Sequence, residues 1–236
     1  MPFRTATSPE VAWLAGIIEG EGYLSAKRGH GLVRVVMTDA DVVARLYAVS
    51  AVGKLNDLPL RAAHHKPVYS WTILREESVL TLLTSVAPLL GTRRRTRAEE
   101  VLALHGRELP AAYQMAPGSP EAWGWVAGMI EGEGYVVPGP DSKDRRPRIG
   151  LQMVDFDVID RLAAITRVGT ICNITPRRQT EQPLRRWTVD RREHIRLVLQ
   201  NILPYLGERR ANRARYVLDL MSTRQRRVQD SNLRGG

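Results

Sequence analysis

Apolar positions in the first half of the chain alternate between helical and strand-like spacing. The segments 9–22, 41–51, 76–90 and 94–106 repeat apolar residues on one helix face, and Ser-Pro-Glu before the first of them is a typical helix start. GLVRVVMTD at 31–39 is rich in β-branched residues, and GKLNDLPLRAA followed by PVYSWTIL is typical of a hairpin. The pattern predicts the order α-β-β-α-β-β-α-α, with four strands that can pair into one sheet.

The same order of patterns occurs a second time. WLAGIIEGEGY at 13–23 returns as WVAGMIEGEGY at 125–135, 112 residues later, and MTDADVVARL at 37–46 returns as MVDFDVIDRL at 153–162, 116 residues later. An insertion inside PGPDSKDRRP explains the change of offset, so we interpret the chain as a duplicated domain. The expected boundaries are a first repeat at 1–107, a linker at 108–120, a second repeat at 121–222 and a disordered tail at 223–236.

Pairs of glycines mark one face of the repeated apolar helix. They are four positions apart in each copy and therefore lie on the same side of the helix: Gly16 and Gly20, and Gly128 and Gly132. Glycine inside a helix costs roughly 0.5–1 kcal/mol relative to alanine, so a strip without side chains needs a reason. We expect the two helices to pack against each other through these strips, backbone to backbone.

Each of these helices ends in Glu-Gly-Glu-Gly, and we expect the last glycine, Gly22 or Gly134, to take the left-handed conformation that often follows a helix. The C-terminal end of a helix disfavours a carboxylate by about 0.3–1 kcal/mol. Helix pairing would also bring Glu21 and Glu133 side by side, so a bound cation would relieve the repulsion, and oxygen ligands suit Mg²⁺. Solvent-facing acids would be the simpler explanation of one copy, but two copies in register favour the metal site.

The charge balance narrows the class of partner. Lysine and arginine number 35 against 25 aspartates and glutamates, which gives a formal net charge of +10. Most of the positive charge is arginine, which suits phosphates and guanine edges. We expect a polyanionic partner, nucleic acid before membrane, with an inert basic surface as the alternative. No apolar run is long enough to span a membrane, and the first residues lack the apolar core of a signal peptide, so we expect a cytoplasmic protein.

The single cysteine, Cys172, excludes an intramolecular disulfide and a Cys-rich zinc site. Its apolar neighbours Ile171 and Ile174 predict a small core residue. The histidines show no metal-ligand spacing. Metal chemistry in this chain is therefore expected from the carboxylates alone.

LAGIIEGEG at 14–22 and VAGMIEGEG at 126–134 resemble, almost position by position, the motif of the LAGLIDADG homing endonucleases in their single-chain, two-motif form. The resemblance covers residues 9–221. It implies an α+β fold of two pseudo-symmetric αββαββα(α) repeats, each a four-stranded antiparallel sheet with helices on one face, joined through the motif helices into a DNA-binding saddle. It also implies a monomer that cleaves double-stranded DNA at a long asymmetric target, with a divalent metal, leaving short 3′ overhangs.

The resemblance assigns roles to the motif residues. The second acid of each motif, Glu21 or Glu133, would hold the metal together with the backbone of Gly20 and Gly132, although aspartate is the commoner ligand in the family. Mg²⁺ is the expected ion, Mn²⁺ a substitute, and Ca²⁺ an ion that supports binding without cleavage. Glu19 and Glu131 stand at the first acidic position of the motif. The resemblance implies a structural role for them, through helix capping and hydrogen bonds across the interface.

Two further pairs of catalytic candidates follow from the resemblance. Asp39 and Asp155 stand at the end of the second strand, where the family has a polar residue that orders water, but both can equally be helix N-caps. Arg93 and Arg209 stand where the family has a basic residue, usually lysine, near the active site. They would stabilise charge on the reacting phosphate, with clamping of the DNA backbone as the alternative. Arginine stays protonated, so neither is a general base.

Bases are expected to be read by polar strand and loop residues that face the groove. The candidates in the first repeat are Ser25, Lys27, Arg28, Arg34, Arg61, His64, Lys66 and Ser70. Those in the second are Lys143, Arg145, Arg146, Arg148, Gln152, Arg177, Arg178, Gln179, Arg185 and Arg186. Alternation along the strands would turn about half of them to the other face. The two sets differ strongly, so the target should be asymmetric, and binding should weaken steeply with salt.

Two other functions remain open from the sequence. One is a non-cleaving DNA-binding regulator or a maturase-like RNA splicing cofactor that keeps this fold, which would be marked by loss of a motif acid, and both acids are present. The other is an RNA-binding module, since basic sheets also bind RNA. Aromatic residues make up only 6% of the chain, which leaves little surface for stacking RNA bases.

Overall fold

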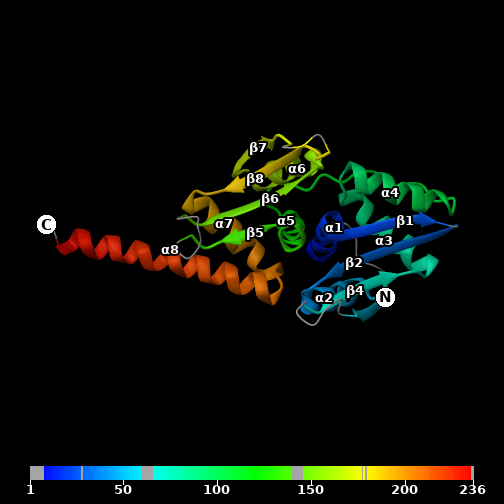
Figure 1. Cartoon of the computed structure of the whole chain (residues 1–236), viewed down its shortest axis with the longest axis horizontal. Helices are drawn as coiled ribbons and strands as arrows, with labels where there is room; N and C mark the ends of the chain where they lie inside the picture. Colours follow the sequence, from blue (N-terminus) through cyan, green and yellow to red (C-terminus); the bar gives the residue numbers. More distant parts are fainter. Residues whose placement is uncertain are drawn as a thin grey trace.

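The chain adopts the predicted element order in both repeats (Figure 1). The computed structural model describes residues 8–27, 29–59, 66–139, 146–176, 178 and 180–234. The first repeat contains α1 (Pro9–Glu21), β1 (Gly22–Lys27), β2 (His30–Met37), α2 (Ala40–Ser50), β3 (Lys54–Leu58), β4 (Val68–Ile73), α3 (Glu76–Val86), the 3₁₀ turn η1 (Ala87–Leu89) and α4 (Thr92–Ala103). The second contains α5 (Pro120–Gly132), β5 (Tyr135–Val137), β6 (Arg148–Met153), α6 (Phe156–Thr166), β7 (Thr170–Ile174), β8 (Leu184–Val189), α7 (Arg192–Ile202), η2 (Leu203–Tyr205) and α8 (Glu208–Arg234).

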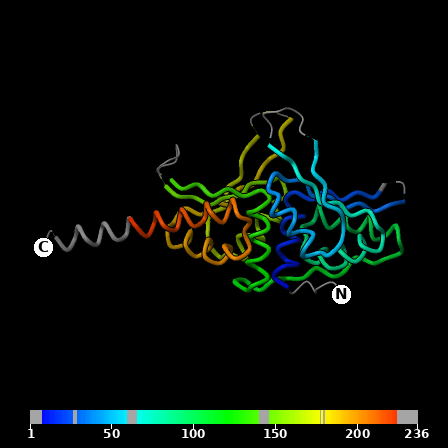
Figure 2. Tube along the Cα trace, turned by 90° about the horizontal axis from the view of Figure 1, so that it is seen from below, coloured from blue at the N-terminus to red at the C-terminus, as the bar shows by residue number. Residues whose placement is uncertain are grey.

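Each repeat forms one antiparallel sheet, ordered β1-β2-β4-β3 in the first and β5-β6-β8-β7 in the second. Alternation along the strands separates two faces: Val33 and Val35 are buried in the core, whereas Arg34 between them projects from the opposite face. Trp71 and Trp187 are buried at matching positions of β4 and β8. In Figure 2 the strands of both repeats lie along one side of the molecule and the helices along the other. The helix-free faces, here called the open faces, therefore point the same way, which confirms the expected α+β architecture.

The motif helices α1 and α5 lie side by side between the two sheets (Figure 1). A Cβ atom on Gly16 would lie 2.4 Å from the carbonyl oxygen of Trp125, and one on Gly128 would lie 2.2 Å from that of Trp13. No side chain fits at either position, because the obstacle is the backbone of the other helix. The predicted packing through glycine strips is therefore confirmed, and it extends to Gly124, whose Cβ would meet the backbone of Pro9.

A second set of contacts joins the repeats on either side of this helix pair. Asp41 at the start of α2 accepts a hydrogen bond of 2.7 Å from the backbone N–H of Glu208, the first residue of α8. Asp157 at the start of α6 accepts one of 2.7 Å from the backbone N–H of Thr92, the first residue of α4. Carboxylates are favourable at helix N-termini, so each repeat caps a helix of the other.

The glycines that follow the motif helices are required for a different reason from the one predicted. Gly22 is extended, with φ −72°, and Gly134 does not have a positive φ, so the left-handed expectation was wrong. A Cβ on Gly22 would lie 2.3 Å from the carbonyl oxygen of Ile18, and one on Gly134 would lie 2.6 Å from Cα of Ile130. The chain turns back so tightly onto the helix that only glycine fits.

The last helix is longer than expected. It continues to Arg234, beyond residue 222 where we expected the second repeat to end, so the predicted disordered tail is helical up to that residue. The sequence from 223 to 234 contains neither glycine nor proline, and its arginines, glutamines and leucine are good helix formers. Figure 1 shows this helix extending away from the body of the molecule.

Candidate active site and nucleic-acid interface

Glu21 and Glu133 lie beside each other at the ends of the paired helices, as predicted. Each glutamate packs against a glycine of the other helix. A Cβ on Gly132 would lie 3.3 Å from Cγ of Glu21, and a Cβ on Gly20 would lie 3.1 Å from Cγ of Glu133. Partial burial, and then the nearby Glu133 carboxylate, raise the pKa of Glu21, while Arg210 and Arg94 oppose the rise. A bound cation would stabilise two carboxylates in this position.

Arg94 and Arg210 cover the C-terminal ends of the motif helices. Arg94 donates to the carbonyl oxygens of Glu19 and Gly20 at 3.2 and 3.3 Å, and Arg210 donates to that of Glu131 at 3.1 Å. Cations at a helix C-terminus are favourable, so these arginines offset the repulsion that the motif acids create. Neither arginine was among the site residues predicted from the sequence, although each directly follows a predicted one, Arg93 or Arg209.

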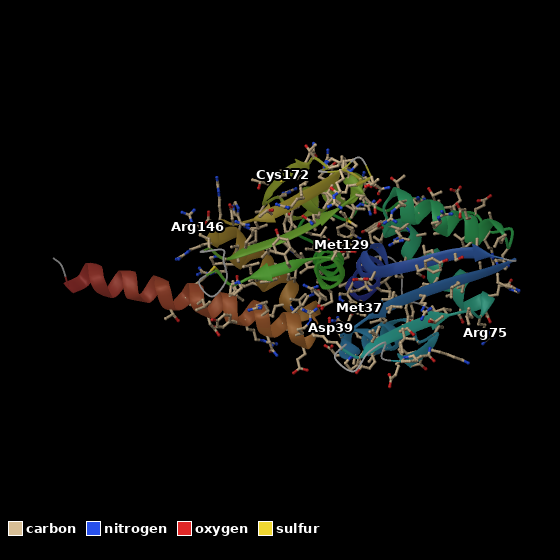
Figure 3. The ribbon with its side chains drawn as sticks, viewed as in Figure 1. Met37, Asp39, Arg75, Met129, Arg146 and Cys172 are labelled. Atoms are coloured by element: carbon tan, nitrogen blue, oxygen red, sulfur yellow. The ribbon has the colours of Figure 1, made fainter. Side chains whose placement is uncertain are left out.

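Two ion pairs cross between the repeats next to the carboxylates. Arg209 donates to both carboxylate oxygens of Asp39 at 2.7 Å, and Arg93 forms the matching pair with Asp155 at 2.6–2.9 Å. Hydrogen bonding from Arg209 lowers the pKa of Asp39. Both aspartates occupy N-cap positions, but neither side chain caps its helix. Figure 3 shows Asp39 at the border between the repeats, near the start of α8.

The first acids of the motifs are buried anchors. Glu19 accepts a 2.6 Å hydrogen bond from the backbone N–H of Gly91, and Glu131 accepts a 2.9 Å bond from that of Gly207. Burial raises the pKa of Glu19 to about 7 and also raises that of Glu131. Their predicted structural position is found, but the bonds run within each repeat rather than across the interface. They tie the motif helix to the turn that carries the arginines.

A cavity of about 230 Å³ opens beside Glu21. Its lining includes Asp39 from the first repeat and Arg209 and Arg210 from the second. An acid, an ion pair and a helix-capping cation from different parts of the chain thus meet around one space. A phosphate that entered it would meet both positive charge and the carboxylates that could hold a metal.

The donor set fits a divalent metal that is completed by its substrate. Within the described part of the chain, no group of three or more His, Cys, Asp or Glu side chains could enclose a metal ion. Mg²⁺ commonly binds through one or two carboxylates plus substrate phosphates and water. Glu21 and Glu133 match that pattern. Of the two predicted backbone ligands, the carbonyl oxygen of Gly20 already accepts the bond from Arg94.

Strand register shows which predicted DNA-reading residues lie on the open faces. Ser25, Arg34 and Ser70 do so in the first sheet, and Arg148, Gln152 and Arg186 in the second, because each alternates with residues buried in the core. Lys66, Arg146 and Arg178 are exposed in the connections. Several candidates lie outside the described residues: Arg28, Arg61, His64, Lys143, Arg145, Arg177 and Gln179, together with the side chain of Lys27.

Arg185 does not lie on the open face. It has the same parity as Trp187, and it donates to Asp160 of α6 at 2.6–2.7 Å and to Asn173 at 3.0 Å, with its guanidinium over the ring of Phe156. It is therefore a structural residue of the helix-covered face. The expectation for Arg185 was wrong, because neighbouring residues of a strand point to opposite faces and the open face takes Arg186.

Cys172 is exposed on the open face of β7, opposite Arg186 in the register (Figure 3). The predicted core position was wrong, because β7 is an edge strand and the residues that flank Cys172 do not bury it.

Among the described residues, no helix is long and apolar enough to cross a membrane, as expected.

Comparisons with known proteins find the fold in solved structures. A scan against protein-family models finds no match, and a search of curated proteins finds none either. The chain is similar to the LAGLIDADG homing endonuclease I-GzeII in complex with its DNA target (10% identity, TM-score 0.61, 92% of this chain and 91% of that chain covered).

Two further structures are similar over the same extent. LAGLIDADG meganuclease I-AabMI bound to uncleaved DNA has 13% identity and a TM-score of 0.61, with 92% of both chains covered. I-SmaMI bound to an uncleaved DNA target in the presence of calcium ions has 12% identity and a TM-score of 0.52, with 92% of both chains covered. At this identity the likeness shows the fold. This chain therefore has the LAGLIDADG homing endonuclease fold, which confirms the resemblance found in its motifs.

Proposed function

We propose that the chain is a site-specific double-strand DNA endonuclease that hydrolyses phosphodiesters with a divalent metal, acts as a monomer and leaves short 3′ overhangs at a long asymmetric target. The observation that carries the proposal is the meeting of Glu21 and Glu133 at a backbone-to-backbone helix contact, where a bound divalent cation would be held by both carboxylates. A purely structural helix pair has no need of two facing carboxylates.

Two further observations support DNA as the substrate. Both open faces point the same way and carry arginine, in a chain with a net charge of +10. The structural neighbours I-GzeII, I-AabMI and I-SmaMI are described in complex with DNA, one of them uncleaved in the presence of calcium ions. We infer that a duplex lies along the two open faces, with its central phosphates above the motif glutamates.

The residues of the chain would divide the reaction between them. A divalent metal held by Glu21 and Glu133 would polarise the scissile phosphate and lower the pKa of a bound water. Arg209, held by Asp39 through Nε and Nη2, can direct Nη1 at a phosphate oxygen and stabilise the charge that develops there. Arg93 and Asp155 would serve the other strand. Water attacks phosphorus in line, and the products are a 5′-phosphate and a 3′-hydroxyl.

The test is incubation of the chain with a library of double-stranded DNA targets, in Mg²⁺ and in Ca²⁺. We expect cleavage in Mg²⁺ and binding without cleavage in Ca²⁺. Glu21→Gln should lower the cleavage rate by about a thousandfold or more, because it removes a metal ligand, while DNA affinity and folding persist. Glu99→Gln on the exposed surface of α4 is the matched control and should cleave normally.

Other outcomes would identify a different function. Equal DNA binding in both ions with no product in Mg²⁺ would favour the non-cleaving regulator. Preference for a structured RNA over duplex DNA would favour the splicing cofactor. Loss of folding in Glu21→Gln would mean that the acid is structural, because the carboxylate would then be needed for folding even when neither DNA nor metal is bound.

A further inference from the structure

The open faces of the two sheets carry residues in rows that run across the strands. In the first sheet one row contains Tyr23, Arg34, Thr72 and Lys54, and the next contains Val36, Ser70 and Asn56. The equivalent rows of the second sheet contain Tyr135, Gly150, Thr188 and Thr170, and then Gln152, Arg186 and Cys172. β2 ends at Met37, just before Asp39, and β6 ends at Met153, just before Asp155. The second row of each sheet is therefore the nearer one to the centre of the molecule.

The first repeat has its arginine in the outer row. The Nε of Arg34 is buried and has no hydrogen-bond partner, and the same holds for the Oγ of Ser70 in the inner row, a side chain that is only 1% exposed. Both residues line a cavity of about 620 Å³ together with Lys54, Asn56 and Thr72. A buried polar atom without a partner is costly, so a ligand that brought polar groups into this cavity would satisfy both side chains.

The second repeat has its arginine in the inner row. Gly150 takes the position equivalent to Arg34, and Tyr135 covers it: a Cβ on Gly150 would lie 2.3 Å from the tyrosine hydroxyl oxygen. Arg186 takes the position equivalent to Ser70 and donates from Nε to the side-chain oxygen of Gln152 at 3.1 Å. This bond holds the guanidinium and leaves its two terminal nitrogens as donors.

We propose that Arg34 and Arg186 each read a guanine, and that the two guanines lie at different distances from the centre of the target. Paired arginine donors match the O6 and N7 acceptors that guanine presents in the major groove. The two rows are two residues apart along a strand, or about 6.8 Å. For a strand that follows the axis of the duplex proposed above, that distance spans about two base pairs at roughly 3.4 Å each. The guanine read by Arg186 is therefore about two base pairs closer to the centre than the one read by Arg34.

Gln152 is a positioning residue in this proposal, because it acts on the base only through Arg186. Gln152→Leu keeps the arginine and removes the acceptor that orients it. The preference for guanine in that half-site should weaken, whereas the overall affinity and its salt dependence should stay close to those of the unmutated chain. A merely structural role would instead lower affinity for all sequences alike.

The inference rests on the proposed function, and one selection experiment tests both. The full chain and its variants select double-stranded DNA from a randomised library in Ca²⁺, and positions are counted from the midpoint of the two cuts made in Mg²⁺. Arg34→Ala and Arg186→Ala should each lower the preference for guanine at one position by roughly tenfold or more. Arg34→Lys and Arg186→Lys should do the same while keeping the charge, since lysine lacks the two-pronged donor geometry. Arg185→Ala is the matched control: it removes a neighbouring charge from the other face of β8 and should leave both guanines unaffected.

The results separate the two claims. Loss of guanine at positions that differ by about two base pairs, one in each half, supports the inference. Loss at equal distances from the midpoint, or preferences that ignore both arginines in sites that are still cut, overturns it and leaves the proposed function intact. A chain that selects no duplex sequence at all overturns the proposed function and this inference together.

Discussion

The two repeats agree closely where they touch and diverge where they face outward. Arg45 on α2 donates to the backbone oxygen of Tyr205 in the second repeat, and Arg161 on α6 donates in return to those of Leu89 and Leu90. On the open faces the equivalent of Arg34 is a glycine, Gly150. The residues that the two repeats have in common are those at their contact, where a two-fold arrangement uses the same residue once in each copy.

The difference indicates two kinds of constraint on one duplicated domain. A contact between repeats is reciprocal, so a change on one side alters the fit on the other, and both copies stay alike. An open-face residue meets only what binds to its own sheet, so each copy can change by itself. Divergence on the open faces is therefore expected of a protein that reads two unequal half-sites.

The largest effect is expected from closing the glycine strip. Gly128→Ala places a Cβ 2.2 Å from the backbone oxygen of Trp13, so the helices must separate, and the free energy of unfolding should fall by about 3 kcal/mol. Gly20→Ala is the matched control, because the atom nearest to its Cβ belongs to the flexible Glu133 side chain at 3.1 Å, the backbone of the other helix lies at an ordinary contact distance of 3.6 Å, and alanine favours the helix. Denaturant titration measures both. Equal losses would show that the strip is not a backbone contact.

A smaller effect is expected at the ion pairs between the repeats. A double-mutant cycle with Asp39→Asn and Arg209→Gln should give a coupling of about 1 kcal/mol, since the arginine side chain is half-exposed, and the Asp155–Arg93 pair should give a similar value. The pKa of Asp39 is lowered on folding, so this contribution is present above its ordinary pKa of 3.8 and is lost as pH falls through the folded value. Coupling in one pair and none in the other would contradict the equivalence of the two sides.

The smallest effect is expected in the alkylation rate of a cysteine on each open face, a measurement that compares the two faces directly and leaves stability unchanged. Cys172 is the only cysteine of the chain, and Asn56 occupies the equivalent position in the first repeat. DNA at about ten times its Kd should slow alkylation of Cys172 about tenfold, because the bound form is covered. Asn56→Cys in a Cys172→Ser background should be protected likewise, as followed by mass spectrometry.

The control for this comparison is Leu197→Cys in the same background, on the exposed surface of α7 in the helical layer. It should stay reactive when DNA is bound. Protection of this position in place of the other two would put the DNA on the helical side of the molecule.

Much of the fold follows from the sequence, because the chain is duplicated and each element predicted in one repeat can be compared with its equivalent in the other. The element order, the helix start at Pro120 and the facing of Glu21 and Glu133 could be predicted from periodicity, capping residues, glycine spacing and the repeated motif. Arg185 could have been placed as well: it lies two positions before Trp187, so the period of a strand puts it on the buried face.

Other features depend on contacts that no local pattern reveals. The trans-capping by Asp41 and Asp157 requires the start of α8 to lie against α2 and that of α4 against α6, which is a property of the assembled pair. The conformation of Gly22 is set by how sharply the chain returns onto Ile18, and left-handed and extended glycines look alike in a sequence. The pairing of Arg93 with Asp155 brings together residues from different repeats, which spacing along the chain cannot predict.

Because main-chain atoms set the approach of α1 to α5, no exchange of side chains on the sheets can bring Glu21 nearer to Glu133 or move it away. In the proposed reaction, the stagger between the two cut strands is then a constant of the scaffold. Variants selected for new targets should differ in which DNA they cut and agree in the length of the ends they leave.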